Sequence, residues 1–331
     1  GNGSTNNITG VGFQPDFTWL KSRSAVYEHA LFDAVRGTGK LLASNNSDAE
    51  YSNSNLLTAF GTDGFSLGDH APLNNNTTTY ASWNWLGANG TAANTDGDIA
   101  STVSANTTSG FSIVSYTGTG SNATVGHGLG SAPSMIIIKN RSVSSGFWRV
   151  YHSGLNSNNK NLKLNATNAE ATDSSIWNDT SPTNVNFSVG TSSDTNGSGN
   201  AMIAYCFADV QGFSKMGSYI GGGNNFPFIY TGFKPGFVLI KNYVSSGWDW
   251  SLSDIPRDNE GSINNIGKRL GPNVNVAEIS NNSYANIQKL SNGFTFNTNN
   301  TEINGQAENY IYMTFARAPL VGSNNVPANA R

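Results

Sequence analysis

The sequence predicts an all-β protein of three tandem modules, each of about 100 residues and each folded as a β-sandwich or jelly-roll-like unit. One segment recurs three times at that spacing, which is typical of a repeat architecture. The composition agrees, because 37 glycines and abundant Asn, Ser and Thr accompany only 12% charged residues. Chains of short strands joined by tight turns have this composition.

The recurring segment runs from a glycine through a proline and a short apolar run to a lysine. Its copies are residues 12–21, 130–139 and 232–241. A run of apolar or β-favouring residues in each copy predicts a short strand that is buried on both faces. These runs are residues 17–20, 135–138 and 237–240. Proline suits the entry to such a strand because it has no N–H to give the ladder. The lysines that we expect to end the strands are Lys21, Lys139 and Lys241.

Further segments recur in the same order after this strand. A second strand ends in a polar residue, at residues 30–33, 148–152 and 250–254. A long loop rich in Asn, Ser and Asp follows, at residues 44–55, 165–184 and 271–284. A strand that begins Gly-Phe or Asn-Phe comes next, at residues 64–67, 186–189 and 293–296. None of the loops has helical periodicity, so the class remains all-β.

The last segment of each module alternates between two kinds of side chain, which predicts a strand. In the first module Ala81, Trp83 and Trp85 share one face. The equivalent residues in the other modules are Ile203, Tyr205, Phe207, Ile311, Met313 and Phe315. We expect this face to line the core.

The repeats divide the chain into modules at residues 1–109, 110–211 and 212–331, the last with a short tail from Val321. We expect the polar residues 92–109 to connect the first two modules.

The starts of the modules differ. Residues 110–120 and 212–222 each predict a strand that runs into a glycine turn, whereas residues 1–4 align with residues 118–121 inside that motif. The first module is therefore expected to lack its first strand and to leave an unpaired edge. We expect an upstream segment or a strand from a neighbouring subunit to cover it.

Charge and composition exclude several classes of function. A net charge of −3 gives no basic surface for a phosphate backbone, so nucleic acid is not an expected partner. No apolar stretch reaches the length of a membrane span, so insertion into a membrane is not expected. The single cysteine, Cys206, lies in an apolar run and is expected to pack as a small hydrophobic residue. No phosphate-binding loop, nucleophile elbow or histidine spacing points to a cofactor or metal.

Candidate ligand-binding residues are aromatic or lie at strand ends. Trp148, Trp248 and Trp250 lie beside Ser-Ser-Gly turns, where they either pack in the core or present a ring face to a sugar. The residues at equivalent strand ends, which either cap turns or contact a ligand, are Asp33, His152 and Asp254. Asp96 and Asp98 form a weak calcium candidate, because no later bidentate Glu completes the loop.

With the repeats laid out, the chain resembles the repeat region of tail-fibre-like proteins of tailed bacteriophages, especially marine ones. The similar phrases are residues 10–16, 29–37, 110–120, 128–130, 139–142 and 326–331. The resemblance implies a location in the virion, contact with other virion proteins and a role in host recognition, and it supplies no catalytic residues. It also suggests a homotrimer, although three internal copies could equally give a pseudo-threefold monomer.

Three functions are consistent with these observations. The first is a structural virion protein of a tail fibre or appendage whose polar loops contact a host-surface glycan or receptor. The second is a polysaccharide-degrading tail spike, which needs two carboxylates about 5 to 10 Å apart across a cleft. The sequence has 21 acidic residues but places no such pair, so we do not expect an enzyme. The third is a capsid-decorating module that binds only proteins.

Overall fold

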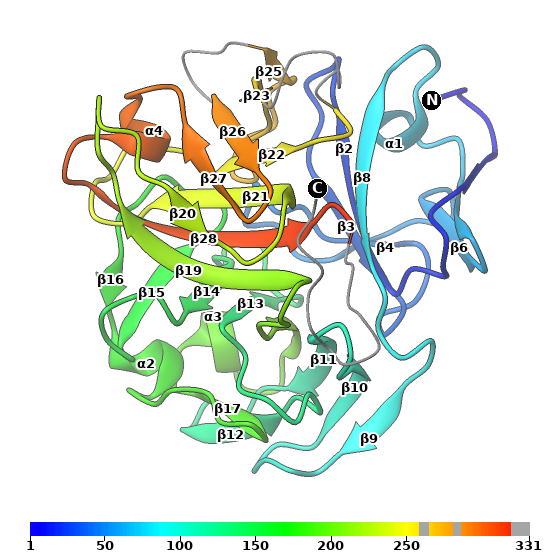
Figure 1. The fold of residues 1–331 in the computed structure, drawn as a ribbon. Helices are drawn as coiled ribbons and strands as arrows, with labels where there is room; N and C mark the ends of the chain where they lie inside the picture. The colour runs from blue at the N-terminus through cyan, green and yellow to red at the C-terminus, as the bar shows by residue number, and fades with distance from the viewer. Residues whose placement is uncertain (258–264, 281–285, 319–331) are drawn as a thin grey trace.

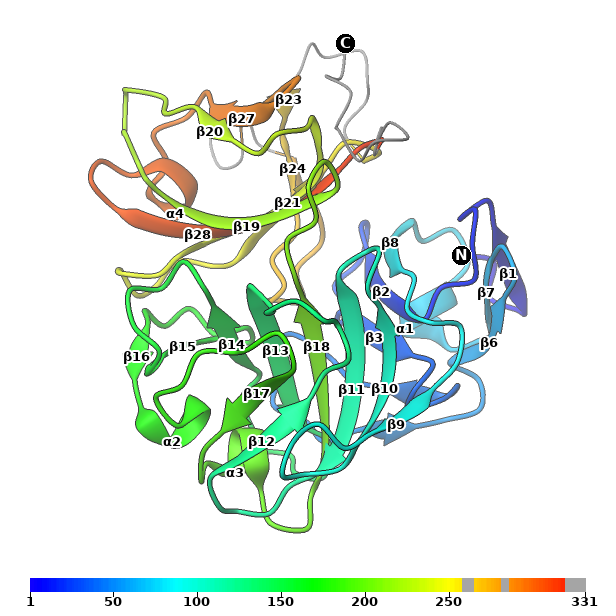
Figure 2. The same cartoon turned by 60° about the horizontal axis from the view of Figure 1, so that its bottom comes forward.

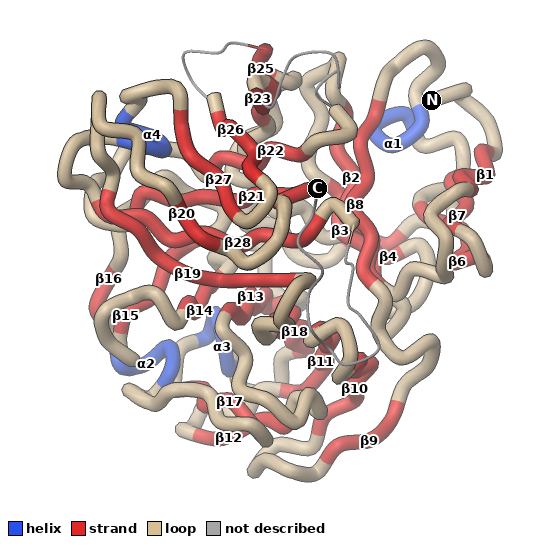
Figure 3. Tube along the Cα trace, viewed as in Figure 1, coloured by secondary structure: helices blue, strands red, loops and turns tan. Residues whose placement is uncertain are grey.

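The chain folds almost entirely into antiparallel β-sheets joined by loops, in a computed structural model that describes residues 1–257, 265–280 and 286–318 (Figures 1 and 3). Within these residues the helices are single turns. They are α1 (Ala71–Asn74), α2 (Ser174–Trp177), α3 (Ser193–Asn196) and α4 (Thr301–Asn304). The expectation of an all-β class is confirmed.

Three sheets, which we call the first, second and third main sheets, are centred on the three copies of the recurring segment. The first has the order β3 (Ala30–Asp33), β2 (Phe17–Ser22), β8 (Tyr80–Trp85). The second has the order β16 (Ala171–Thr172), β15 (Lys160–Lys163), β14 (Arg149–His152), β13 (Met135–Asn140), β18 (Ala201–Phe207), β11 (Phe111–Thr117), β10 (Ser101–Asn106), β9 (Ala92–Asn94). The third has the order β19 (Ser214–Ile220), β28 (Asn309–Ala316), β21 (Pro235–Asn242), β22 (Ser251–Asp254).

Smaller sheets accompany the main ones. One contains β1 (Asn6–Thr9), β7 (Gly64–Leu67) and β6 (Leu57–Gly61), and a second pairs β12 (Ala123–Gly126) with β17 (Asn186–Val189). A third contains β20 (Ile229–Tyr230), β27 (Gly293–Phe296), β26 (Ile287–Leu290) and β23 (Asn265–Ile266). The remaining pairs are β4 (Lys40–Leu41) with β5 (Tyr51–Ser52) and β24 (Lys268–Arg269) with β25 (Ile279–Ser280).

The central strands of the main sheets have the same neighbours. Each of β2, β13 and β21 pairs antiparallel with the strand that follows it in the chain and with the last strand of its repeat. The register is also the same, with Phe17 opposite Trp85, Met135 opposite Phe207 and Phe237 opposite Phe315. The apolar runs of all three strands are buried, as their sequences predict.

The prediction that the lysines end these strands is wrong. Lys21, Lys139 and Lys241 lie within β2, β13 and β21 and are at most 1% exposed. A lysine can occupy such a position because its ammonium donates hydrogen bonds to backbone carbonyl groups, in loops for Lys139 and Lys241 and at Ser22 for Lys21.

The cores combine one shared cluster with local ones. Alternate residues of all three main sheets meet in a single buried cluster at the centre of the molecule, which we call the shared core. The predicted inward faces of β8, β18 and β28 lie in it or against it. The opposite face of each main sheet packs on a small sheet, through three separate local clusters. Figure 2 shows the corresponding blue, green and yellow-to-red parts around this centre.

Residues 92–109 do not form a polar connection, which corrects that prediction. They contain β9 and β10, which extend the second main sheet beyond β11. Val103 is 6% exposed and packs in the local cluster of this sheet, together with Ile99. The apolar residues here are too widely spaced among polar ones for the strand pattern to be visible in the sequence.

An asparagine at the end of a helical turn recurs in all three repeats and fixes the glycine turns. Asn74, Asn196 and Asn304 are buried, and each side-chain oxygen accepts from a backbone N–H of the glycine-rich turn, at 3.0, 2.7 and 2.9 Å. Their carbonyl groups accept from Gly3, Gly120 and Gly223 at 2.7, 2.8 and 3.0 Å. The alignment of residues 1–4 with residues 118–121 therefore also holds in space.

Candidate functional site

Two of the three tryptophan candidates lie in the shared core. Trp148 is 0% and Trp250 1% exposed. Their indole Nε1 groups donate to the carbonyl groups of Ala43 (2.8 Å) and Lys163 (2.9 Å). Each ring thus binds the preceding repeat, Trp148 at a loop and Trp250 at the end of β15. Of the two alternatives predicted for them, these two rings take the core-packing one, whereas Trp248 is half-buried.

The strand-end candidates are buried turn caps. Asp33 accepts from the backbone N–H of Arg36 (2.8 Å) and forms an ion pair with its guanidinium (2.5 Å). Asp254 does the same with Arg257, at 3.1 and 2.5 Å. Each of these carboxylates faces a guanidinium inside the protein, which favours the turn-capping alternative.

His152 occupies the equivalent position in the second repeat with different chemistry. Its Nδ1 accepts from the backbone N–H of Gly154 (2.9 Å), and its Nε2 lies 3.1 Å from the carbonyl oxygen of Tyr312. Burial lowers its pKa to about 4, so the ring is neutral near pH 7 and Nε2 donates to that carbonyl. Leu155 stands where the other repeats have arginine and packs into the shared core.

Glutamate residues join the main sheets where the loop of one repeat meets the next. The contact of Glu50 with the second main sheet is called the first junction. The backbone N–H of Glu50 donates to the carbonyl of Arg141 (2.9 Å), and its carboxylate accepts from Arg141 (2.8 Å) and Arg36 (3.1 Å). Burial opposes ionisation of Glu50, but the two guanidinium groups outweigh it and lower the pKa.

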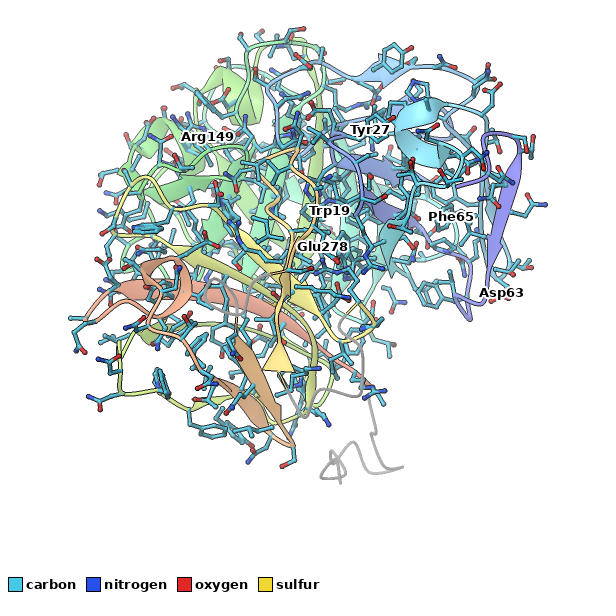
Figure 4. All side chains as sticks on the ribbon, turned by 90° about the horizontal axis from the view of Figure 1, so that it is seen from above. Trp19, Tyr27, Asp63, Phe65, Arg149 and Glu278 are labelled. Carbon is cyan, nitrogen blue, oxygen red and sulfur yellow. The ribbon has the colours of Figure 1, made fainter. Side chains whose placement is uncertain are left out.

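The third junction repeats this arrangement between the third and first main sheets. The backbone N–H of Glu278 donates to the carbonyl of Arg23 (2.8 Å), and its carboxylate accepts from Arg23 (2.9 Å) and Arg257 (3.0 Å). Arg23 and Glu278 are 255 positions apart, so the contact closes a ring of three sheets. Figure 4 labels Glu278 and Trp19 near the middle of the molecule, where the yellow and blue parts meet.

The second junction keeps the backbone contact and changes the side chains. The N–H of Glu170 donates to the carbonyl of Tyr243 (2.8 Å), but its carboxylate pairs with Lys160 (2.9 Å) of its own repeat. Tyr243 stands where the other junctions have Arg141 or Arg23, and Leu155 replaces the second arginine.

Two of the three buried lysines support these junctions, whereas Lys21 donates to the carbonyl of the adjacent Ser22 (2.8 Å). Lys139 Nζ donates to the carbonyls of Ser47 (2.9 Å) and Gly146 (2.8 Å), so it binds the loop of the first repeat. Lys241 Nζ donates to the carbonyls of Trp248 (2.6 Å) and Thr167 (3.4 Å), the latter in the loop of the second repeat. Burial lowers the pKa of Lys21, Lys139 and Lys241 to about 8.

The weak calcium candidates are satisfied by protein donors. Asp98 accepts from the backbone N–H (2.9 Å) and hydroxyl (2.8 Å) of Thr124, and Asp96 accepts from the amide of Asn94 (2.9 Å). Within the described residues no group of three or more His, Cys, Asp and Glu side chains could hold a metal ion. These aspartates stabilise the loop through hydrogen bonds.

An open surface pocket lies between the joint of the second and third repeats and the β20 strand. It has a volume of about 380 Å³ and is lined by Asp209, Gln211, Lys215 and Tyr230, among others. Tyr230 is 62% exposed, and the positive φ of Gly232 (85°) turns the chain beneath its ring. The pocket combines an aromatic ring with a carboxylate, an amide and an ammonium group. This is the set of groups that proteins use to bind sugars.

Sequence reasoning missed both the ionic junctions and this pocket. The repeated spacing Asp33 to Arg36 and Asp254 to Arg257 was a signal for buried ion pairs in turns. Tyr230 had a weaker signal, since it follows the aromatic residues Phe226 and Phe228, which are also exposed.

Comparison with protein families gives one match. A model described as a domain of unknown function (DUF7483) matches residues 1–319. The chain belongs to this family. No curated protein and no solved structure matches it. The DUF7483 chain has no helix, within its described residues, that is long and apolar enough to cross a membrane.

Proposed function

We propose that this DUF7483 chain is a structural protein of a bacteriophage tail fibre or similar virion appendage, and that it contributes to recognition of a host-surface glycan. We further propose that it consists of three tandem β modules, at residues 1–109, 110–211 and 212–331, in which β9 and β10 of the first range complete the sheet of the second module. The recurrent pairing of the main sheets and the ring of junctions support this organisation. Three sheets that pack around the shared core form a rigid support for surface loops.

The observation that carries the recognition proposal is the pocket at Tyr230. Its ring is exposed, so it can stack on the apolar face of a sugar without rearrangement of the core. Asp209 and Gln211 are exposed beside it and can accept and donate hydrogen bonds to sugar hydroxyl groups. The pocket is open to the surface, so it can admit a terminal or internal sugar unit of a surface polysaccharide.

Glycan-array binding tests this proposal with three proteins: the unmodified chain, Tyr230→Ala and a matched control, Tyr51→Ala. Tyr51 is a second exposed tyrosine, 48% exposed, in the first repeat. We expect the unmodified chain and the control to bind the same glycans, and Tyr230→Ala to bind about tenfold more weakly, a loss of about 1.4 kcal/mol. Equal binding by all three, or no binding to any glycan, would contradict it.

A reducing-sugar release assay on the bound glycans separates recognition from degradation. We expect no release above the buffer control. Release of sugar that persists in Tyr230→Ala would replace the structural proposal with that of a tail-spike enzyme.

A further inference from the structure

The strand β8 has an open edge that its counterparts lack. In the second and third main sheets, β18 and β28 each pair on both sides, whereas among the residues that the structure describes the first main sheet ends at β8. The burial pattern agrees. All residues of β18 after its first are buried, but in β8 only Trp83 and Trp85 are buried.

In the second and third main sheets, the strands that cover the corresponding edge occupy equivalent positions. β11 pairs with β18 and β19 with β28, and both run into a glycine turn held by the recurrent asparagine. Both also reach the preceding repeat. Phe111 of β11 stacks 5.9 Å from Phe17, and Ser218 of β19 packs so closely on Gly154 that an added Cβ there would lie 3.1 Å away.

The corresponding place beside β8 is an open groove of about 370 Å³. It is lined on one side by consecutive residues of β8, from Tyr80 to Trp83, which alternate between the two faces of the sheet. Its other side is the third repeat, including Phe237 and Pro256. Because both faces of β8 contribute, the groove follows the strand edge. Pro256 is two positions after Asp254, as Gly154 is after His152, so the groove matches the place filled by β19.

Gly1 contacts Thr78, two residues before the first β8 residue that lines the groove. Its amino group donates to the carbonyl of Thr78 at 2.6 Å. The backbone N–H of Gly118 donates to Asn200 at 2.9 Å, and that of Gly221 to Glu308 at 2.8 Å, at equivalent points just after β11 and β19. A strand that entered through the groove would thus meet the chain at Gly1.

We propose that the β8 edge is a docking site for one extended strand, which runs antiparallel to β8 and joins Gly1, and which has the alternating chemistry of β11. The register follows from β11, whose Thr117 precedes Gly118. The residue joined to Gly1 lies opposite Thr79, and the residue six positions earlier lies opposite Trp85. That earlier residue is aromatic, like Phe111, because it packs on the shared core.

The main-chain groups that receive the strand can be identified. The carbonyls of Thr79 and Trp85 accept from Arg23 and Asp16 on the β2 side. Since backbone groups alternate sides along a strand, those of Tyr80, Ser82 and Asn84 face the groove. Their amides report directly on whether the edge is paired.

The test fuses the β11 sequence Phe-Ser-Ile-Val-Ser-Tyr-Thr to Gly1 and follows amide hydrogen exchange by NMR. We expect exchange at Tyr80, Ser82 and Asn84 to slow by about tenfold or more relative to the unfused chain. A control fusion with proline at the three positions opposite Tyr80, Ser82 and Asn84 cannot form the ladder and should leave these amides unchanged. The melting temperature should rise in the first fusion alone.

Two results would overturn the proposal. Unchanged exchange at all three amides in the first fusion would show that the edge does not take a strand. A doubled mass by light scattering, together with slow exchange at these amides in the unfused chain, would show that a second copy fills the groove. A doubled mass of the fusion would show that the fused strand pairs with a second copy by strand swapping. Both readouts are independent of glycan binding, because the groove and the Tyr230 pocket share no lining residue.

Discussion

The first and second junctions join neighbouring sheets with the same backbone contact and opposite side-chain chemistry. In the first, Asp33, Arg36, Glu50 and Arg141 form a buried ionic chain. In the second, the equivalent positions of three of these are His152, Leu155 and Tyr243, and Glu170 keeps only Lys160. The third junction follows the first. The ring therefore depends on the loop-to-sheet backbone contact, while its side chains form one of two self-consistent sets.

This comparison explains why the strand-end position holds Asp twice and His once. An aspartate there needs the guanidinium three residues later, since a buried carboxylate without a partner is strongly destabilising. A neutral histidine needs only a hydrogen bond and allows leucine to extend the shared core. The pair, rather than the single residue, is the unit that differs between repeats.

The largest loss of stability is expected when the ionic set of side chains at the first junction is broken. Arg36→Leu removes a guanidinium that is 0% exposed, which leaves the buried Asp33 without its ion-pair partner and Glu50 with Arg141 and Lys40. We expect the free energy of unfolding to fall by about 3–5 kcal/mol. Urea unfolding measures this change, and a loss below about 1 kcal/mol would show that the ion pair is not required.

The matched control converts the whole set. Asp33→His combined with Arg36→Leu recreates the His152 and Leu155 pair, and we expect it to recover about half of the loss in Arg36→Leu. A double variant that is less stable than the single one would contradict the view that the pair is the unit.

Substitution of Glu50 and of Glu170 should lower the free energy of unfolding by smaller and unequal amounts. Glu50→Gln weakens hydrogen bonds to two guanidinium groups and should lower the free energy of unfolding by about 2 kcal/mol. Glu170→Gln affects one partly exposed pair and should lower it by about 1 kcal/mol or less. Parallel urea titrations compare them, and equal losses would remove the distinction between the junctions.

The buried lysines give a smaller, pH-dependent effect. Lys139 has a folded-state pKa of about 8, below its unfolded value of about 10.4, so between these values the unfolded state binds more protons. Its contribution to the free energy of unfolding should therefore rise from pH 8 to pH 10, by on the order of 1 kcal/mol. Lys139→Met should lack this rise. The difference between the two proteins is the measurement, since buried tyrosines such as Tyr205 have raised pKa values and reduce stability above about pH 10 in both.

Local patterns predicted the strands, and the contacts between repeats stayed hidden. The burial of β2, β13 and β21 and the inward face of β8 follow from apolar runs and alternation, which are properties of a few neighbouring residues. Lys139 was misjudged and the role of Trp148 was left open because their partners, Ser47 and Ala43, lie about a hundred residues earlier. The sequence also predicts three separate cores. The shared core was not visible, because strands buried on both faces look the same whether the second face meets a small sheet or another repeat.

Native-state hydrogen exchange on the three central strands tests most directly whether the sheets form one ring around one core. The amides of β2, β13 and β21 should exchange with a single free energy of opening, equal to that of global unfolding, because no main sheet can leave without exposing the shared core. Three distinct free energies, one for each strand, would mean that the repeats unfold as independent domains and would contradict this account.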